Sequence, residues 1–181
     1  EVTGWVGTCT DIHDRKRAED AQVLILEASA VLGTSLDYRR TLAQVAQLAV
    51  PRMGDWCAVH VLDDDGSLRE IAVVHADPAK LKFVLELQER YPPDPDAPVG
   101  VASVVRTGRS ELIPEIADEL LVANARDELH LDLIRELALR SWLCVPLTAR
   151  GRTLGAITFV AAESGRRFDD ADLRLAEDLA R

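Results

Sequence analysis

The side chains best suited to chemistry are three cysteines and four histidines. An odd number of cysteines without short spacings predicts neither a disulfide framework nor a zinc site. Cys57 and Cys144 stand in apolar runs, where a free thiol packs as a small hydrophobe. The histidines are His13, His60, His75 and His130. They stand at no metal-ligand spacing, and neither HExxH nor CxxC occurs, so we expect no metal, reduced thiols and a cytoplasmic protein.

The sequence contains no pattern that predicts a catalytic centre. A serine nucleophile needs a strand–turn–helix elbow such as Gly-x-Ser-x-Gly, which does not occur. His13 lacks the His-Glu-Leu-Arg context of a phosphoaccepting histidine in a kinase dimerisation helix. We therefore expect that the 181 residues have no catalytic activity of their own.

The composition is that of one acidic globular domain. The 181 residues are 48% hydrophobic and 29% charged, with a net charge of −10. This balance argues against a nucleic-acid partner or a membrane surface, because both require clustered Lys and Arg. Only 4% of residues are aromatic, which disfavours a large planar cofactor. The chain starts at Glu1 rather than Met, so we expect a piece of a longer protein.

The elements that must position any site follow from periodicity, which predicts an α+β fold around an antiparallel sheet. Strand patterns cover residues 55–62, 68–75, 110–114, 141–148 and 153–161. Helical patterns cover residues 15–35, 37–52, 78–91, 99–107 and 115–139. The last of these is broken near Asn124, and Asp169 caps a final helix. Hairpin turns at Asp65-Gly66 and Arg150-Gly151 favour antiparallel pairing.

The last hairpin determines on which face of the sheet each candidate ligand-binding residue lies. If Arg150-Gly151 is a two-residue turn and the pairing continues unbroken, side chains alternate between two faces. One face then carries Trp142, Cys144, Ile157 and Phe159, and the other carries Leu143, Val145, Ala156 and Thr158. A polar residue in an apolar strand points to a ligand, although a satisfied polar group is the simpler alternative. The candidates are His60, Thr158, Trp142 and Cys144.

The terminal helices predict a dimer. Apolar residues repeat at three-and-four spacing in both, the spacing of a coiled-coil seam. The candidate interface residues are Ala21, Leu24, Ala28 and Val31 in the first helix, and Leu173, Ala176 and Ala180 in the last. We expect a parallel homodimer. The alternative is that these stripes form the core face within one chain, and both can hold at once.

Two segments resemble known families. Residues 11–22, DIHDRKRAEDAQ, resemble the exit from a PAS domain, with His13 at the usual Thr position and residues 15–19 matching. This resemblance implies that residues 1–14 are a PAS remnant and residues 15–36 a connecting signalling helix.

Residues 37–181 resemble a GAF domain. The matching features are WCAVHVLDDDGSL, the segment from Gly100 to Gly108, SWLCVPLTARGRTLGAITFVAAES and RFDDADLRLAEDLA. The resemblance implies a six-stranded antiparallel sheet with helices on both faces and the N- and C-terminal helices packed together. It also implies a sensory or dimerisation module between PAS units and an output such as a histidine kinase or a PPM-type serine/threonine phosphatase.

The GAF resemblance also limits the ligand. The cyclic-nucleotide members carry a motif from Asn-Lys to Phe-x-x-x-Asp-Glu, whereas Leu173 stands where Glu belongs and no Asn-Lys pair occurs. Cyclic nucleotides are therefore disfavoured. A bilin is disfavoured because its pocket residues are not matched, and haem because a lone strand histidine such as His60 or His75 is more often packed. The ligand itself is not identified.

Three functions follow from these observations. The leading one is a non-catalytic regulatory GAF domain of a multidomain bacterial signalling protein, which binds a small ligand and relays a signal through its terminal helices. The alternative is a dimerisation or spacer module without a ligand. The third, a free-methionine sulfoxide reductase, needs redox-active cysteines close together on the pocket side.

Overall fold

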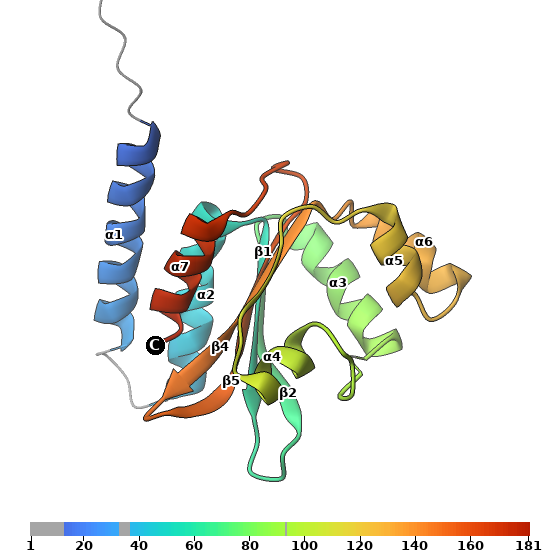
Figure 1. Ribbon diagram of the computed structural model, residues 1–181, viewed down its shortest axis with the longest axis horizontal. Helices are drawn as coiled ribbons and strands as arrows, with labels where there is room; N and C mark the ends of the chain where they lie inside the picture. Colours follow the sequence, from blue (N-terminus) through green and yellow to red (C-terminus); the bar gives the residue numbers. More distant parts are fainter. Residues whose placement is uncertain (1–12, 33–36, 93) are drawn as a thin grey trace, which may run out of the picture.

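An antiparallel sheet of five strands forms the centre of the computed structural model, which describes residues 13–32, 37–92 and 94–181 (Figure 1). The strand order is β2-β1-β5-β4-β3. The strands are β1 (Trp56–Leu62), β2 (Leu68–His75), β3 (Glu111–Ile113), β4 (Ser141–Ala149) and β5 (Arg152–Ala161). The PAS remnant proposed for residues 1–14 lies outside the described residues, apart from His13 and Asp14 at the start of the first helix.

Helices cover both faces of the sheet (Figure 1). One face carries α1 (His13–Leu32), α2 (Tyr38–Met53) and α7 (Asp170–Leu179). The other carries α3 (Pro78–Arg90) and α4 (Val101–Thr107), with α6 (Glu128–Glu136) packed against α3 and α5 (Asp118–Asn124) beside α6. Aspartates that accept N–H groups of the first turn start several of these helices; they are Asp37, Asp77, Asp127 and Asp169. The predicted α+β class and the helices and strands from residue 37 onward are confirmed.

The expectation of six strands is wrong for the described residues, which form five. The sixth strand came only from the family resemblance. Residues 92–98 contain several prolines, which lack the N–H that a ladder requires, and residues 118–136 form α5 and α6 instead. The middle of the chain therefore supplies only the three-residue strand β3.

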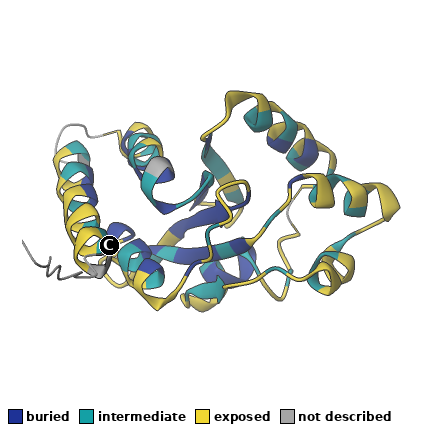
Figure 2. Cartoon of the chain, turned by 90° about the horizontal axis from the view of Figure 1, so that it is seen from above, coloured by how far each residue is buried: buried dark blue, intermediate teal, exposed yellow. Residues whose placement is uncertain are grey.

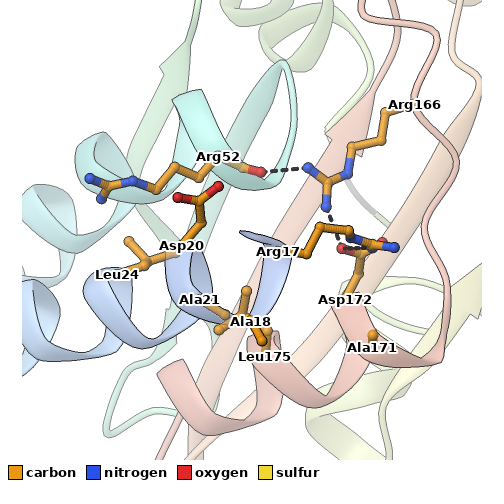
Figure 3. A pocket seen from close by; sticks show the side chains of 10 residues that line it. All are labelled: Arg17, Ala18, Asp20, Ala21, Leu24, Arg52, Arg166, Ala171, Asp172 and Leu175. Atoms are coloured by element: carbon orange, nitrogen blue, oxygen red, sulfur yellow. Dashed lines mark hydrogen bonds and ion pairs between the residues drawn. The ribbon is translucent and has the colours of Figure 1, made fainter. Parts of the chain in front are cut away.

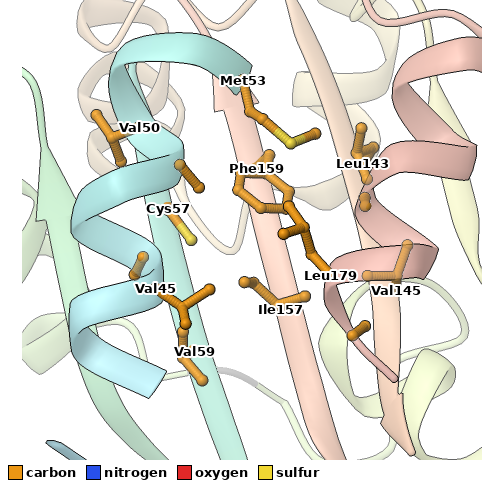
Figure 4. Packing of buried hydrophobic residues seen from close by; sticks show 14 of the residues in the cluster. Val45, Val50, Met53, Cys57, Val59, Leu143, Val145, Ile157, Phe159 and Leu179 are labelled. Carbon is orange, nitrogen blue, oxygen red and sulfur yellow. The ribbon is translucent and has the colours of Figure 1, made fainter. Parts of the chain in front are cut away.

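The main core lies between the sheet and the α1, α2 and α7 layer. Figure 4 shows Val45 of α2 and Leu179 of α7 facing Ile157 and Phe159 of β5. Figure 2 shows that burial is concentrated in the central strands, whereas the outer side of α1 is exposed. Aliphatic residues dominate this core, as the low aromatic content predicted.

The predicted pairing of the last hairpin is correct at the turn and wrong beyond it. Arg150 and Gly151 both have positive φ, as a two-residue hairpin turn requires. Pairing then shifts after Thr148↔Thr153 to Leu147↔Gly155, which leaves Leu154 as an extra residue. Because one extra residue exchanges the two faces of a strand, β5 is reversed relative to the prediction.

The bulge decides which side chains share a face. Cys144 now pairs with Thr158, and both belong to the face covered by α4. Ile157 and Phe159 belong to the opposite face, in the main core. The predicted grouping of Trp142 and Cys144 with Ile157 and Phe159 is therefore wrong.

Candidate functional site

The four predicted ligand-binding residues lie on one face of the sheet. Thr158 of β5 pairs with Cys144 of β4 on one side and with Ala58 of β1 on the other. His60 follows two positions after Ala58 and pairs with Ala156. The bulge in β5 thus brings Cys144 and Thr158 to the same face as His60.

Thr158, Cys144 and Trp142 pack beneath α4. Thr158 Oγ1 donates a hydrogen bond to Cys144 Sγ at 3.3 Å, and both residues are buried. Val104 of α4 packs with Cys144, and Trp142 adds a half-buried indole to the same cluster. These side chains are hydrogen-bonded to each other or apolar, so they form the packed surface beneath α4.

His60 is in a different situation. It is only 5% exposed, yet its Nδ1 atom is buried without a hydrogen-bond partner. Its Nε2 atom lies 3.5 Å from Oε2 of Glu70. Burial lowers the pKa of the imidazole to about 4, so the ring is neutral near pH 7.

Glu70 and Gln88 complete the surroundings of His60, and the sequence reading missed both. Gln88 Nε2 donates to Glu70 Oε2 at 2.8 Å, while Gln88 Oε1 is buried without a partner. Burial raises the pKa of Glu70. Glu70 pairs with His60 because the β1–β2 loop has three residues, 64–66, between Asp63 and Ser67, whereas a two-residue turn at Asp65-Gly66 would have placed Ile71 there. Gln88 had no signal in the sequence, because it lies on α3, far along the chain.

Two hollows open beside His60, and the imidazole lines both. The smaller, of about 280 Å³, lies between β2 and α3. Its lining residues are His60, Leu68, Glu70, Leu85, Gln88 and Glu89. The larger, of about 580 Å³, is bounded by the β1–β2 turn, by Asp94 and Asp96, and by α4. Together they are the best candidate for a small-molecule site on this face of the sheet.

Gly155 holds β1 close to β5 at this site. A Cβ on this residue would lie 2.0 Å from the carbonyl oxygen of His60. Only glycine allows so close an approach of the two backbones. The absence of a side chain at Gly155 therefore allows the β1 backbone at His60 to lie against β5.

The opposite side of the molecule holds a junction of charged side chains between α1 and α7 (Figure 3). The Asp172 carboxylate is only 3% exposed and pairs through Oδ1 with Arg17 of α1 at 3.1 Å and with Arg166. Its Oδ2 accepts the N–H of Asp169 at 3.0 Å, which closes a capping box on α7. Arg17 also pairs with Asp169 at 3.0 Å. One buried carboxylate thus joins the first helix to the last.

A hollow of about 450 Å³ lies at this junction, but its arginines are already engaged (Figure 3). Arg166 donates to the carbonyl of Arg52 at 2.5 Å as well as pairing with Asp172. Arg52 pairs with Glu27 of α1 at 2.6 Å. These contacts bind helices together, so the junction is a structural link rather than an anion site.

The predicted dimer-interface residues face the chain's own core. Leu24 and Ala28 of α1, and Ala176 and Ala180 of α7, are buried there. The remaining three are partly buried; they are Ala21, Val31 and Leu173. The outer side of α1 instead exposes Leu26, which is 70% exposed, and Val23.

The two described cysteines cannot act together. Cys57 belongs to the main core, whereas Cys144 lies on the α4 face of the same sheet. Burial raises the pKa of both thiols, to about 12 for Cys144. Cys9 lies outside the described residues. Within the described part of the chain, His, Cys, Asp and Glu nowhere form a group of three that could hold a metal ion.

Comparison with known proteins identifies the fold. Residues 37–181 match the family model of the GAF domain. No curated protein matches the chain. The described helices include none that is long and apolar enough to cross a lipid bilayer.

Several solved structures share this fold. The GAF domain of a phosphoenolpyruvate-protein phosphotransferase from Coxiella burnetii has a TM-score of 0.62 at 14% identity, with 90% of this chain and 89% of that chain covered. The fRMsr of Staphylococcus aureus, in complex with substrate, has a TM-score of 0.59 at 13% identity, with coverages of 88% and 90%. The GAF domain of the cyanobacteriochrome TePixJ has a TM-score of 0.56 at 19% identity, with coverages of 82% and 88%. At these identities the likeness concerns the fold alone.

Proposed function

The chain belongs to the GAF domain family through residues 37–181, and on this premise we propose that it is a sensory or regulatory module of a multidomain bacterial signalling protein. It binds a small molecule at the His60 hollows and relays occupancy to its terminal helices. It is not itself an enzyme. One observation supports this proposal above the others: His60, whose buried Nδ1 has no hydrogen-bond partner, lines hollows on one sheet face, and the α1–α7 junction lies on the other.

The strands offer a short route between the two faces. His60 alternates along β1 with Val59, which is fully buried in the main core near Val45 of α2 (Figure 4). A ligand that moves the His60 backbone must also move Val59, because both belong to one pleated strand. Close packing of the core then transmits the shift to α2 and, through Leu179, to α7.

The terminal helices are the output of the module. Arg17 ties α1 to Asp172 of α7, so a displacement of either helix alters their junction. We place an upstream PAS domain before α1 and an output domain, such as a histidine kinase or a PPM-type phosphatase, after α7. The module acts as a parallel homodimer, with the exposed Val23 and Leu26 of α1 at the contact.

A dimerisation or spacer module without a ligand is the second candidate. It is favoured by the packing of Thr158, Cys144 and Trp142 beneath α4, which fills part of the face with the chain's own side chains. A free-methionine sulfoxide reductase is disfavoured, because Cys57 and Cys144 lie on opposite faces of the sheet and cannot form a disulfide with each other.

Native mass spectrometry separates these functions. The chain is incubated with the small-molecule fraction of a bacterial extract, desalted, and weighed under native and denaturing conditions. The sensory module retains an added mass that denaturation releases. Leu85→Trp, which places an indole beside His60 in the smaller hollow, loses that mass, whereas Leu129→Trp on the exposed side of α6 keeps it. Equal masses in all samples would favour the spacer.

A further inference from the structure

We propose that the His60 hollows take a small aliphatic molecule bearing a cationic nitrogen, such as a primary ammonium or a guanidinium group. This inference rests on the proposed function, since it names the class of ligand for the same site. Three independent features point to it: the unpartnered acceptor atoms of residues that line the hollows, the charge of the lining side chains, and the shape of the walls.

The unpartnered atoms are hydrogen-bond acceptors. Nε2 of the neutral His60 ring faces the carboxylate oxygen of Glu70, so the ring proton belongs on Nε2 and Nδ1 is left as an acceptor. Gln88 uses its amide nitrogen to donate to Glu70, which leaves the Oε1 atom as a second acceptor. Buried acceptors without partners are costly, and a ligand that donates N–H bonds would satisfy both.

The charge of the hollows selects a cation. Carboxylates contribute to both linings; they belong to Glu70, Glu89, Asp94 and Asp96. Among the described residues that line the hollows, Arg106 is the one basic side chain. Its guanidinium donates to the carbonyls of Ala97 at 3.0 Å and Pro95 at 3.4 Å, so it is engaged by the backbone. An anionic ligand would meet carboxylates with no free cation to balance them.

The walls fit a short aliphatic chain. Leu68 and Leu85 line the smaller hollow, while Leu62, Val101 and Val105 line the larger one. Volumes of about 280 and 580 Å³ suit a molecule with a few methylene groups between polar ends. A diamine places one nitrogen at Glu70 and the other toward Asp94 and Asp96.

The probe is putrescine, compared with two molecules of the same chain length, succinate and 1,4-butanediol. Each is titrated into the whole chain in phosphate buffer free of amines and followed by two-dimensional amide NMR. We expect putrescine to shift amides around His60 and Gln88, and to bind at least tenfold more tightly than either analogue.

Matched variants locate the binding. Glu70→Gln removes one carboxylate from the site and should weaken putrescine about tenfold, whereas Glu119→Gln makes the same charge change on the exposed side of α5 and should leave it unchanged. If Glu70→Gln loses its dispersed spectrum, Glu89→Gln at the rim of the smaller hollow replaces it, with an expected weakening of about threefold.

Three results would overturn the inference. Succinate or butanediol binding beside His60 as tightly as putrescine would refute the cationic class while leaving the proposed function intact. Putrescine binding that is not weakened in Glu70→Gln, or in Glu89→Gln where that variant replaces it, would refute the site. Absence of putrescine binding would refute the inference, and the native mass measurement would still decide the proposed function on its own.

Discussion

Nε2 of His60 lies 3.5 Å from Oε2 of Glu70, at paired positions of β1 and β2. The same Glu70 oxygen accepts a hydrogen bond from Gln88, so one carboxylate joins two strands and α3. Burial keeps the His60 ring neutral near pH 7, with Nδ1 as an acceptor without a partner, one residue from the core side chain of Val59. This relationship places the proposed ligand site one residue along β1 from the main core.

Protonation of His60 should destabilise the fold. Burial lowers its pKa from 6.5 to about 4, so within that interval the unfolded chain binds a proton that the folded chain does not. The His60 contribution to the free energy of unfolding is complete above the unfolded pKa and falls by about 3 kcal/mol as the pH drops through the folded pKa. Urea unfolding at a series of pH values should show that the free energy of unfolding of the wild type falls relative to that of His60→Gln as the pH drops across this interval. A constant difference between the two proteins would contradict the lowered pKa. Glu70, whose pKa is raised by burial, is present in both proteins, and its contribution to the free energy of unfolding changes with pH in the opposite direction.

Removing the buried carboxylate of the helix junction should cost more than removing its exposed partner. Asp172→Ala leaves Arg166 without its carboxylate partner and breaks the capping box, so we expect a loss of about 3 kcal/mol in the free energy of unfolding. Arg17→Ala should cost less than about 1 kcal/mol, because Arg17 is 37% exposed, but it should speed amide exchange throughout α1. Arg15→Ala, which removes an exposed pair with Glu19, is the control and should change neither quantity. Equal effects of Arg15→Ala and Arg17→Ala on exchange would argue against the link.

Substitution of Gly155 should disturb the His60 site directly. The new Cβ of Gly155→Ala would lie 2.0 Å from the His60 carbonyl oxygen, so β1 must move. We expect a loss of about 2 kcal/mol in stability and a shift of the His60 imidazole resonance. Gly151→Ala meets no atom within 4 Å but has a φ of +74°, so it should cost only about 1 kcal/mol and leave that resonance unchanged. An unaltered His60 resonance in Gly155→Ala would contradict the proposed approach of the two strands.

The proposed dimer should depend on the outer side of α1. Leu26→Glu places a charge at a position that is 70% exposed, so it should convert the chain to a monomer without loss of fold stability in the protomer. Leu24→Ala, in the core, should instead lower the free energy of unfolding by about 3 kcal/mol and leave the assembly intact. Light scattering at roughly 100 μM measures the mass, because dimerisation follows mass action. A monomeric wild type at this concentration would exclude the dimer.

The order and type of the elements could be predicted from the sequence because each depends on local signals. Asp169 caps α7, and the Arg150-Gly151 turn sets the last hairpin. The bulge at Leu154 could not be predicted, because side-chain alternation gives no sign of it; it lies next to Gly155, which approaches the β1 backbone, a segment distant in the chain. The single extra residue exchanged the predicted faces of β5.

The candidate site could be predicted only in part for the same reason. His60 stood out as a polar residue in an apolar strand, and the structure places it at the hollows. Thr158 stood out by the same rule, but it is satisfied by Cys144 and packed beneath α4. Gln88 could not have been chosen from sequence, because its role depends on the docking of α3 against β2.

Amide hydrogen exchange tests most directly whether the His60 face communicates with the terminal helices. The chain is compared before and after loading with the small-molecule fraction of a bacterial extract, in the wild type and in Leu85→Trp. We expect loading to change exchange in α1 and α7 of the wild type, as well as in β1 and α3, and we expect none of these changes in Leu85→Trp. Exchange that changes only beside His60, with α1 and α7 unaltered, would contradict the proposed relay.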